Sequence, residues 1–232
     1  MAKAMPSSER RVGALTRERI IDAAIELLDS EGENGLTFRA LAERLETGHG
    51  AIQWHIANKS ELLKAATAVA VARAMDEADR DAPPREAIHA VALGVFDAID
   101  AHPWIGGQLG RPPWQSTMLQ IFELIGRQVE ALGTAAAAQF TSTSALLHYI
   151  IGAGGQNATN SRAPVALGDR QHVLDTIAGH WEGLDPKEFA FTRTMAEQLR
   201  VHDDRAEFLA GIDLILAGMS GSTVSGARTK SD

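Results

Sequence analysis

The chain has no cysteine among its 232 residues. A disulfide framework, a thiolate metal site and a cysteine nucleophile are therefore excluded. It also lacks any stretch of about 18 uncharged apolar residues that would suggest a membrane span, and its first residues lack the apolar run of a secretory signal peptide. We therefore expect a cytoplasmic protein that has no membrane partner.

The usual signatures of enzymes are missing as well. The sequence has no Gly-rich phosphate loop after a strand, no Gly-x-Ser-x-Gly nucleophile elbow and no closely spaced set of metal ligands. His49 and His55 are six residues apart, which does not match the i, i+4 spacing that places two ligands on one helical face. We expect a protein that is not an enzyme, with no catalytic residue, no metal ion and no cofactor.

An overall excess of positive charge is also absent, since the formal net charge is -8. The acidic residues are concentrated away from the N-terminus: residues 1–64 carry nine Lys and Arg against ten Asp and Glu, whereas the remainder carries thirteen against twenty. The first nineteen residues are basic by three charges. Such an arm can follow DNA phosphates or a minor groove; the alternative is a disordered tail that aids solubility.

The most informative stretch that is present runs from Leu36 to Leu63. Apolar residues recur there at helical spacing in two short segments, separated by a break at Glu46–Gly48. Thr37 is placed to cap the first segment. Two short helices with a tight turn between them are typical of a helix-turn-helix, whose second helix reads base edges in the major groove. The polar face of this second helix carries His49, Gln53 and His55.

Three segments together resemble the DNA-binding domain of the TetR (TetR/AcrR-like) family of transcriptional regulators. TRERIIDAAIELLDSEG matches the first helix of that domain, LTFRALAERL the second, and IQWHIANKSELL the recognition helix and the start of the fourth. The resemblance covers roughly residues 14–64. By this resemblance, the residues that face DNA are Thr37, Arg39, His49, Gly50, Ala51, Gln53, Trp54, His55 and Lys59.

The sequence departs from the family pattern at several points. Glu46 occupies the turn position where the family usually has a left-handed Gly, so we expect strain there. Ala51 and Gln53 replace the usual hydroxyl-bearing residues, and the amide of Gln53 is able to pair with adenine in a bidentate manner. Gly50 weakens its helix by about 1 kcal/mol relative to Ala. Trp54 suits two interpretations equally, a contact with DNA or packing against the first or fourth helix.

The resemblance implies an all-α fold of about nine to ten helices, with a three-helix DNA-binding domain and a larger helical ligand-binding and dimerisation domain. We assign residues 1–13 to a basic flexible arm, 14–64 to the helix-turn-helix domain, 65–219 to the effector-binding and dimerisation domain, and 220–232 to a disordered tail. The expected helices after the helix-turn-helix, which include one capped by Ser60, are Ser60–Asp79, Arg85–Ala101, a short segment over 102–110, Trp114–Phe140, Ser142–Ser161, Arg170–His180, Asp185–Val201 and Asp203–Met219.

In TetR-like proteins the last two long helices pair with their mates in a four-helix bundle. The segments Ser142–Ser161 and Asp203–Met219 hold the corresponding places in the chain, and they are rich in small and apolar residues. The alternative is that either helix belongs only to the core. The glycines expected to permit close approach of a partner helix are Gly152, Gly154, Gly155, Gly211 and Gly218.

The resemblance also implies an effector pocket in the second domain, since an apolar cavity with a few fixed polar groups suits a small molecule. Trp104 and Trp114 flank a proline-rich region and are the favoured candidates. The alternative is that these residues are core, helix caps or dimer contacts. The full candidate set is Trp104, Trp114, Met118, Phe122, His148, Gln156, Asn157 and Trp181, with Asn160 nearby.

We therefore expect a ligand-responsive regulator that binds a double-stranded palindromic operator as a homodimer and is released from it by a small molecule whose identity is unknown. The family favours repression. Two alternatives remain open: a transcriptional activator, and a helical protein-interaction module whose helix-turn-helix does not bind DNA.

Overall fold

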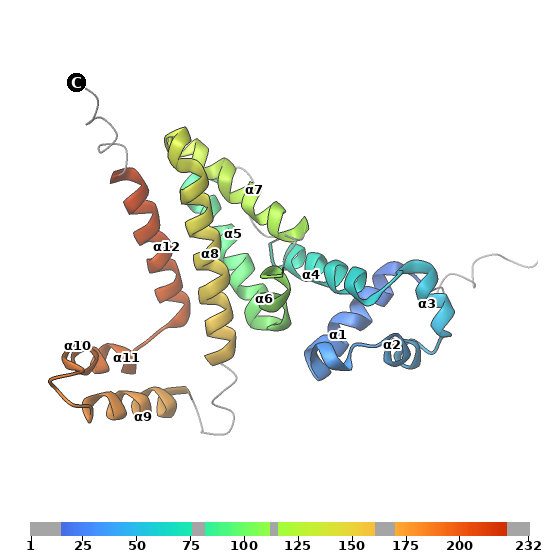
Figure 1. Ribbon diagram of the computed structural model, residues 1–232, viewed down its shortest axis with the longest axis horizontal. Coiled ribbons are helices and arrows are strands. Elements are labelled where there is room, and N and C mark those ends of the chain that lie inside the picture. The colour runs from blue at the N-terminus through green and yellow to red at the C-terminus, as the bar shows by residue number, and fades with distance from the viewer. Residues whose placement is uncertain (1–14, 76–81, 112–115, 161–169, 222–232) are drawn as a thin grey trace, which may run out of the picture.

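The computed structural model describes residues 15–75, 82–111, 116–160 and 170–221, and over these residues it contains helices and no strand (Figure 1). The predicted all-α class is thus confirmed. The N-terminal helices are α1 (Arg17–Gly35), α2 (Phe38–Arg44), α3 (His49–His55) and α4 (Lys59–Met75). They are followed by α5 (Pro84–Ala101), α6 (Trp104–Leu109), α7 (Ser116–Ala131), α8 (Ala136–Asn160), α9 (Arg170–Glu182), α10 (Ala190–Thr194), α11 (Ala196–Arg200) and α12 (Asp204–Gly221).

The first three helices and the start of α4 enclose one small apolar core. Each helix contributes a stripe at helical spacing, and the stripes meet in a cluster of side chains that solvent does not reach. The start of α2 is capped as the sequence predicts, since the hydroxyl of Thr37 accepts from the Ala40 amide at 3.0 Å. The hydroxyl of Thr16 caps α1 in the same way and accepts from the Arg19 amide at 3.2 Å. The members of this core include Ile20, Leu28, Leu36, Leu41, Ile52, Ile56 and Leu62.

The first helix is interrupted near its C-terminus. Gly32 has φ 69° and ψ -172°, a conformation that a residue with a Cβ adopts only with strain. The residues after it, up to Gly35, form a separate turn that leads to the buried Leu36 and the cap of α2. This break therefore sets where α2 begins relative to α1.

The second domain is built around α5, α7 and α8, which pack against one another, while α12 covers α8 and part of α5 (Figure 1). The long α4 packs on α1, α5 and α7, so its buried residues join the cores of both domains. The short α6 contacts α1 and α4 on one side and α5 and α8 on the other. It is thus the element of the second domain that lies against the end of α1.

The prediction of one long helix over Trp114–Phe140 is wrong. α7 ends at Ala131, Gly133 adopts φ 78°, and α8 begins at Ala136 rather than Ser142. The amide of Gly133 donates to the Glu130 carbonyl at 2.9 Å and the next amide donates to Val129 at 3.4 Å, which is a Schellman ending. Apolar residues continue across the break, so the sequence pattern did not indicate that the helix ends at Gly133.

Two other expected helices differ from the structure. The segment Asp185–Val201 is not one helix, because a turn at 183–188 precedes two short helices, α10 and α11, that are separated at Met195. The fourth helix begins at Lys59 and is capped by Asn58, whose side chain accepts from the Glu61 amide at 2.9 Å, rather than by Ser60. The expected arm, the residues between the helices expected at Ser142–Ser161 and Arg170–His180, and nearly all of the expected tail lie outside the described residues.

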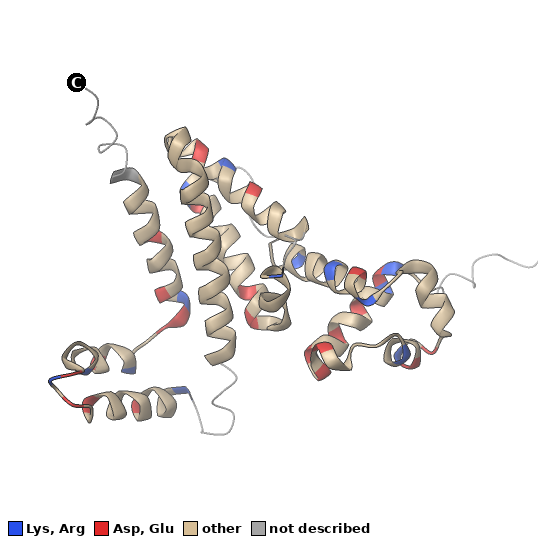
Figure 2. Ribbon diagram, in the orientation of Figure 1, with Lys and Arg blue, Asp and Glu red and all other residues tan. Residues whose placement is uncertain are grey.

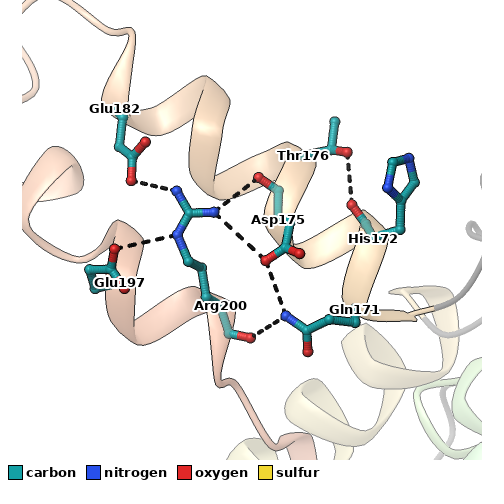
Figure 3. A network of polar contacts seen from close by, with 7 residues as sticks. All are labelled: Gln171, His172, Asp175, Thr176, Glu182, Glu197 and Arg200. Carbon is teal, nitrogen blue, oxygen red and sulfur yellow. Dashed lines mark hydrogen bonds and ion pairs between the residues drawn. The ribbon is translucent and has the colours of Figure 1, made fainter.

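The helices α9, α10 and α11 form a hairpin whose main contacts are with one another (Figure 1). Arg200 holds it together: its guanidinium pairs with Glu182 and lies 3.5 Å from Glu197 and 3.7 Å from Asp175 (Figure 3). The carboxylate of Glu182 raises the pKa of Arg200 further above its ordinary value. In the described part of the chain, no helix is long and apolar enough to span a bilayer.

Candidate DNA-binding surface

The turn between α2 and α3 is a Schellman ending with glutamate at the left-handed position. Glu46 has φ 50°, and it is the one residue other than glycine with a positive φ among the described residues. Its amide donates to the Glu43 carbonyl at 3.2 Å, and the amide of Thr47 donates to Ala42 at 2.9 Å. The strain that the sequence predicts here is confirmed, and the turn keeps its helix-ending hydrogen bonds despite it.

One face of α3 is anchored in the core and the other is open to solvent. Ile52 is 0% exposed and Ile56 is 1% exposed, so two apolar side chains fix the helix on the domain. The indole of Trp54 is 88% exposed. Packing against α1 or α4, one of the two interpretations of this residue, is therefore wrong. The exposed residues of the helix are His49, Gly50, Ala51, Gln53 and Trp54, whereas His55 is half-buried.

Two residues at the start of α3 have particular geometry. The ring of His49 meets that of Phe38 edge to face, with centroids 5.5 Å apart, which orients the imidazole against α2. A Cβ built on Gly50 would have no heavy atom within 4 Å. Packing inside the chain therefore does not require glycine at this position, and the bare backbone faces solvent.

The cationic candidates differ in how much of their donor capacity the protein already uses. Arg39 is exposed, and no partner for its guanidinium is found among the described residues. Lys59 is half-buried, and its ammonium donates to the backbone carbonyl of Glu33. An ammonium has three donors, so two remain for another acceptor. Arg44 is engaged, since its guanidinium donates to Glu26 at 2.7 and 2.9 Å.

The start of α4 beside Lys59 is held by a reciprocal cap. Glu61 accepts from the amide of Ala57 at 2.9 Å and pairs with Arg17 at 3.1 Å, while Asn58 accepts from the Glu61 amide. The backbone donor of Ala57, followed by Arg17, lowers the pKa of Glu61. The carboxylate therefore stays charged at neutral pH and ties α4 to α1.

The candidate effector residues do not form one group. In the interior, Met118 is buried and Phe122 is half-buried, with its ring 6.0 Å from that of Phe140. The amide of Asn157 is buried and donates to Asp100 at 2.8 Å. Trp104 is at the boundary with α1. His148 and Gln156 are exposed on α8, Trp181 belongs to the α9–α11 hairpin, and Trp114 lies outside the described residues.

The predicted glycine contacts are corrected in part. Gly154 and Gly211 serve packing inside the chain, because a Cβ would lie 3.1 Å from Ile99 at the first and would overlap the hydroxyl of Tyr149 at the second. Gly152 and Gly218 have no atom within 4 Å of such a Cβ. In the described residues, no group of three or more His, Asp or Glu is placed to hold a metal ion.

Residues 20–66, which span most of the described helix-turn-helix domain, match the family described as bacterial regulatory proteins, tetR family. The structure of the transcriptional regulator SCO7222, a TetR from Streptomyces coelicolor, is 54% identical, covers 90% of this chain and 99% of its own, and superposes with a TM-score of 0.82. The chain belongs to the TetR family. The fold of this TetR-family chain also resembles that of ActR from Streptomyces coelicolor in complex with actinorhodin (21% identity, 92% of this chain and 99% of that one, TM-score 0.72).

Two relatives of known name match over shorter stretches. An HTH-type transcriptional regulator from Saccharopolyspora erythraea is 27% identical over 139 residues, which are 60% of this chain and 59% of that protein. The tetracycline repressor protein class D from Escherichia coli is 45% identical over 62 residues, or 27% of this chain and 28% of the repressor. The chain thus spans less than two thirds of the length of either.

Proposed function

We propose that this TetR-family protein is a transcriptional repressor that binds a palindromic operator as a homodimer and leaves it when a small molecule binds the second domain. The observation that carries the proposal is the exposed face of α3, which is fixed from behind by Ile52 and Ile56. A recognition helix lies in the major groove, so its outer side chains must be free to meet base edges. The assigned limits, 14–64 for the DNA-binding unit and 65–219 for the rest, belong to this proposal.

Within the face we assign separate roles. Gln53 is placed to read a base, since its amide is exposed and can both donate to and accept from one base edge. Arg39 and Lys59 are placed to bind phosphate, and Trp54 to lie against the sugar-phosphate backbone. Phosphate contacts position the helix and base contacts give specificity. The remaining members of the surface are Thr37, His49, Gly50, Ala51 and His55.

The dimer is proposed to form through α8 and α12. The 25 residues of α8 include no Lys, Arg, Asp or Glu, and Figure 2 shows the helix without a charged position. Helix α12 is uncharged after Asp213. Each has an exposed stripe at helical spacing that contains no Lys, Arg, Asp or Glu, which suits a contact between the same helices of two chains. The stripes are Thr141, Ala145, His148, Gly152 and Gln156 on α8, and Ala210, Leu214, Ala217 and Gly218 on α12.

The effector is proposed to enter the interior of α5, α7 and α8. This core contains Met118 and the partly buried Phe122, with Asn157 as a polar group. The name of the tetracycline repressor and the actinorhodin complex of ActR support a small-molecule effector. We assign His148 and Gln156 to the dimer contact rather than to the effector site, because both are exposed on the α8 stripe.

Selection of duplexes from a random pool by the purified full chain tests the proposal. A palindromic winner supports both operator binding and the twofold dimer, whereas failure to retain any duplex at low salt refutes the function. Affinity for the winner should fall steeply with salt, because phosphate contacts release counterions. Gln53→Ala should reduce discrimination at one base pair by about 1 to 3 kcal/mol. Equal losses on all sequences would remove Gln53 from base reading.

A further inference from the structure

The end of α1 and the helix α6 are joined by two carboxylates. Nδ1 of His102 lies 2.8 Å and 3.0 Å from the oxygens of Asp29, and the indole N–H of Trp104 donates to the same carboxylate at 2.8 Å. Glu33 accepts from both terminal nitrogens of Arg111, at 3.0 and 2.7 Å, and from Gln108 at 3.1 Å. The first group borders the start of α6 and the second borders its end. Helix α6 is thus tied to α1 at both ends.

Glu33 differs from Asp29 because it also contacts the DNA-binding surface. It lies just after the break at Gly32, and its backbone carbonyl accepts from the ammonium of Lys59, the first residue of α4. One residue therefore holds α6 through its side chain and α4 through its main chain. The same turn leads into Leu36 and the cap of α2, so its position also sets where the helix-turn-helix starts.

The other side of α6 is seated firmly in the second domain. Ile105 and Leu109 are fully buried. A Cβ on Gly106 would meet Ile99 of α5 at 3.7 Å and the Cα of Gly155 of α8 at 3.9 Å, so α6 lies close to both core helices. Because packed cores move as units rather than deform continuously, a shift of α5 or α8 carries α6 with it. Through Gln108 and Arg111, α6 would transmit that shift to Glu33 at the end of α1.

Glu33 is charged at neutral pH and forms a bidentate ion pair with Arg111. The hydrogen bonds from Arg111, together with the charges of Arg111 and Lys59, lower the pKa of this carboxyl. It is therefore ionised at neutral pH, and a bidentate guanidinium–carboxylate pair fixes direction as well as distance. Lys could replace the charge of Arg111 but not this geometry.

We propose that Glu33 is a positioning residue that sets the angle between the helix-turn-helix and the second domain. In a dimer that angle fixes the separation of the two recognition helices, so the inference rests on the proposed operator binding for its consequence, although not for its geometry. Loss of the pair with Arg111 leaves α4, the Asp29 contacts and the single hydrogen bond from Gln108 to Glu33 to connect the domains, and the angle then varies over a wider range.

The test uses the absence of cysteine in the full chain. Two exposed residues of one chain are replaced by cysteine, Gln53→Cys on α3 and Gln120→Cys on α7, and both cysteines are spin-labelled. The labelled chain is diluted with unlabelled protein so that each dimer holds one labelled pair, and the distance between the two labels is measured. We expect Arg111→Ala to broaden the distance distribution at least about twofold, as an added hinge would, and Arg111→Lys to broaden it less. Arg127→Ala is the matched control, because Arg127 pairs with Glu123 within α7 at 2.7 Å and does not connect the domains.

An unchanged width in Arg111→Ala overturns the proposal, whether or not the protein binds DNA. The consequence is measured separately with the selected operator and a version that has one base pair inserted between its half-sites. We expect the insertion to lower the operator affinity of the parent chain about tenfold. It should lower the affinity of Arg111→Ala about threefold or less, and this difference is within the usual range of coupling between sites. If the distance distribution broadens in Arg111→Ala but the parent chain binds no duplex, the role of Glu33 is supported and only the proposed operator binding is refuted.

Discussion

Two neighbours on α3, Ile52 and Trp54, should separate folding from recognition. Ile52 is 0% exposed and lies in the core, whereas Trp54 is 88% exposed. Ile52→Ala should lower the free energy of unfolding by about 2 to 5 kcal/mol, the usual cost of removing a buried aliphatic side chain. Trp54→Ala should change it by no more than about 0.5 kcal/mol, since surface substitutions away from special features have effects of that size.

Urea unfolding followed by far-ultraviolet circular dichroism measures both changes. Fluorescence anisotropy with the selected duplex measures the effect on binding: at a temperature where both variants are folded, Trp54→Ala should weaken affinity and Ile52→Ala should retain more of it. Ile52→Val is the matched mild control and should lower the free energy of unfolding by about 0.5 to 1.5 kcal/mol. A loss of stability above about 1 kcal/mol in Trp54→Ala would mean that its indole is packed, and the proposed surface would then be wrong.

Three further changes test the local structure. Glu46→Gly should raise the free energy of unfolding by about 1 kcal/mol, because φ 50° is strained for glutamate but not for glycine; a loss in urea unfolding would contradict this. Asn58→Ala should lower it by about 1 kcal/mol through loss of the α4 cap, and Ser60→Ala is the control that should have little effect. Glu33 has a pKa below its ordinary 4.5, so its contribution is full above pH 4.5 and is lost as the pH falls through the lowered value. Glu33→Gln should therefore be less stable than the parent at neutral pH, the gap should close on acidification, and a gap independent of pH would refute the ion pair.

The helix-turn-helix could be predicted from the sequence because its signals are local. Thr37 is followed by apolar residues at helical spacing, and the break at Glu46–Gly48 separates two such stretches. The cap and the strained turn follow from these residues alone. Whether Trp54 faces solvent did not follow, since an indole suits a core and a DNA surface equally, and only the packing of α3 on its neighbours decides it.

The contacts between the domains had no comparable local signal. Glu33 and Arg111 are 78 positions apart, and neither belongs to a motif. Tertiary packing of α6 brings them together, so sequence spacing alone did not single them out. In the same way, Gly154 and Gly211 are typical of either a dimer contact or an internal one, and the positions of Ile99 and Tyr149 decide for the interior.

The two faces of α3 contribute differently to the fold and to the departures of this chain from the family pattern. Folding depends on the inner residues, Ile52 and Ile56, which agree with the family pattern and cannot be truncated without loss of the core. The outer residues Gly50, Ala51 and Gln53 contribute little to packing, and two of these, Ala51 and Gln53, depart from that pattern. We therefore expect substitutions on the outer face to leave the domain folded and, under the proposed function, to change the base sequence that is read.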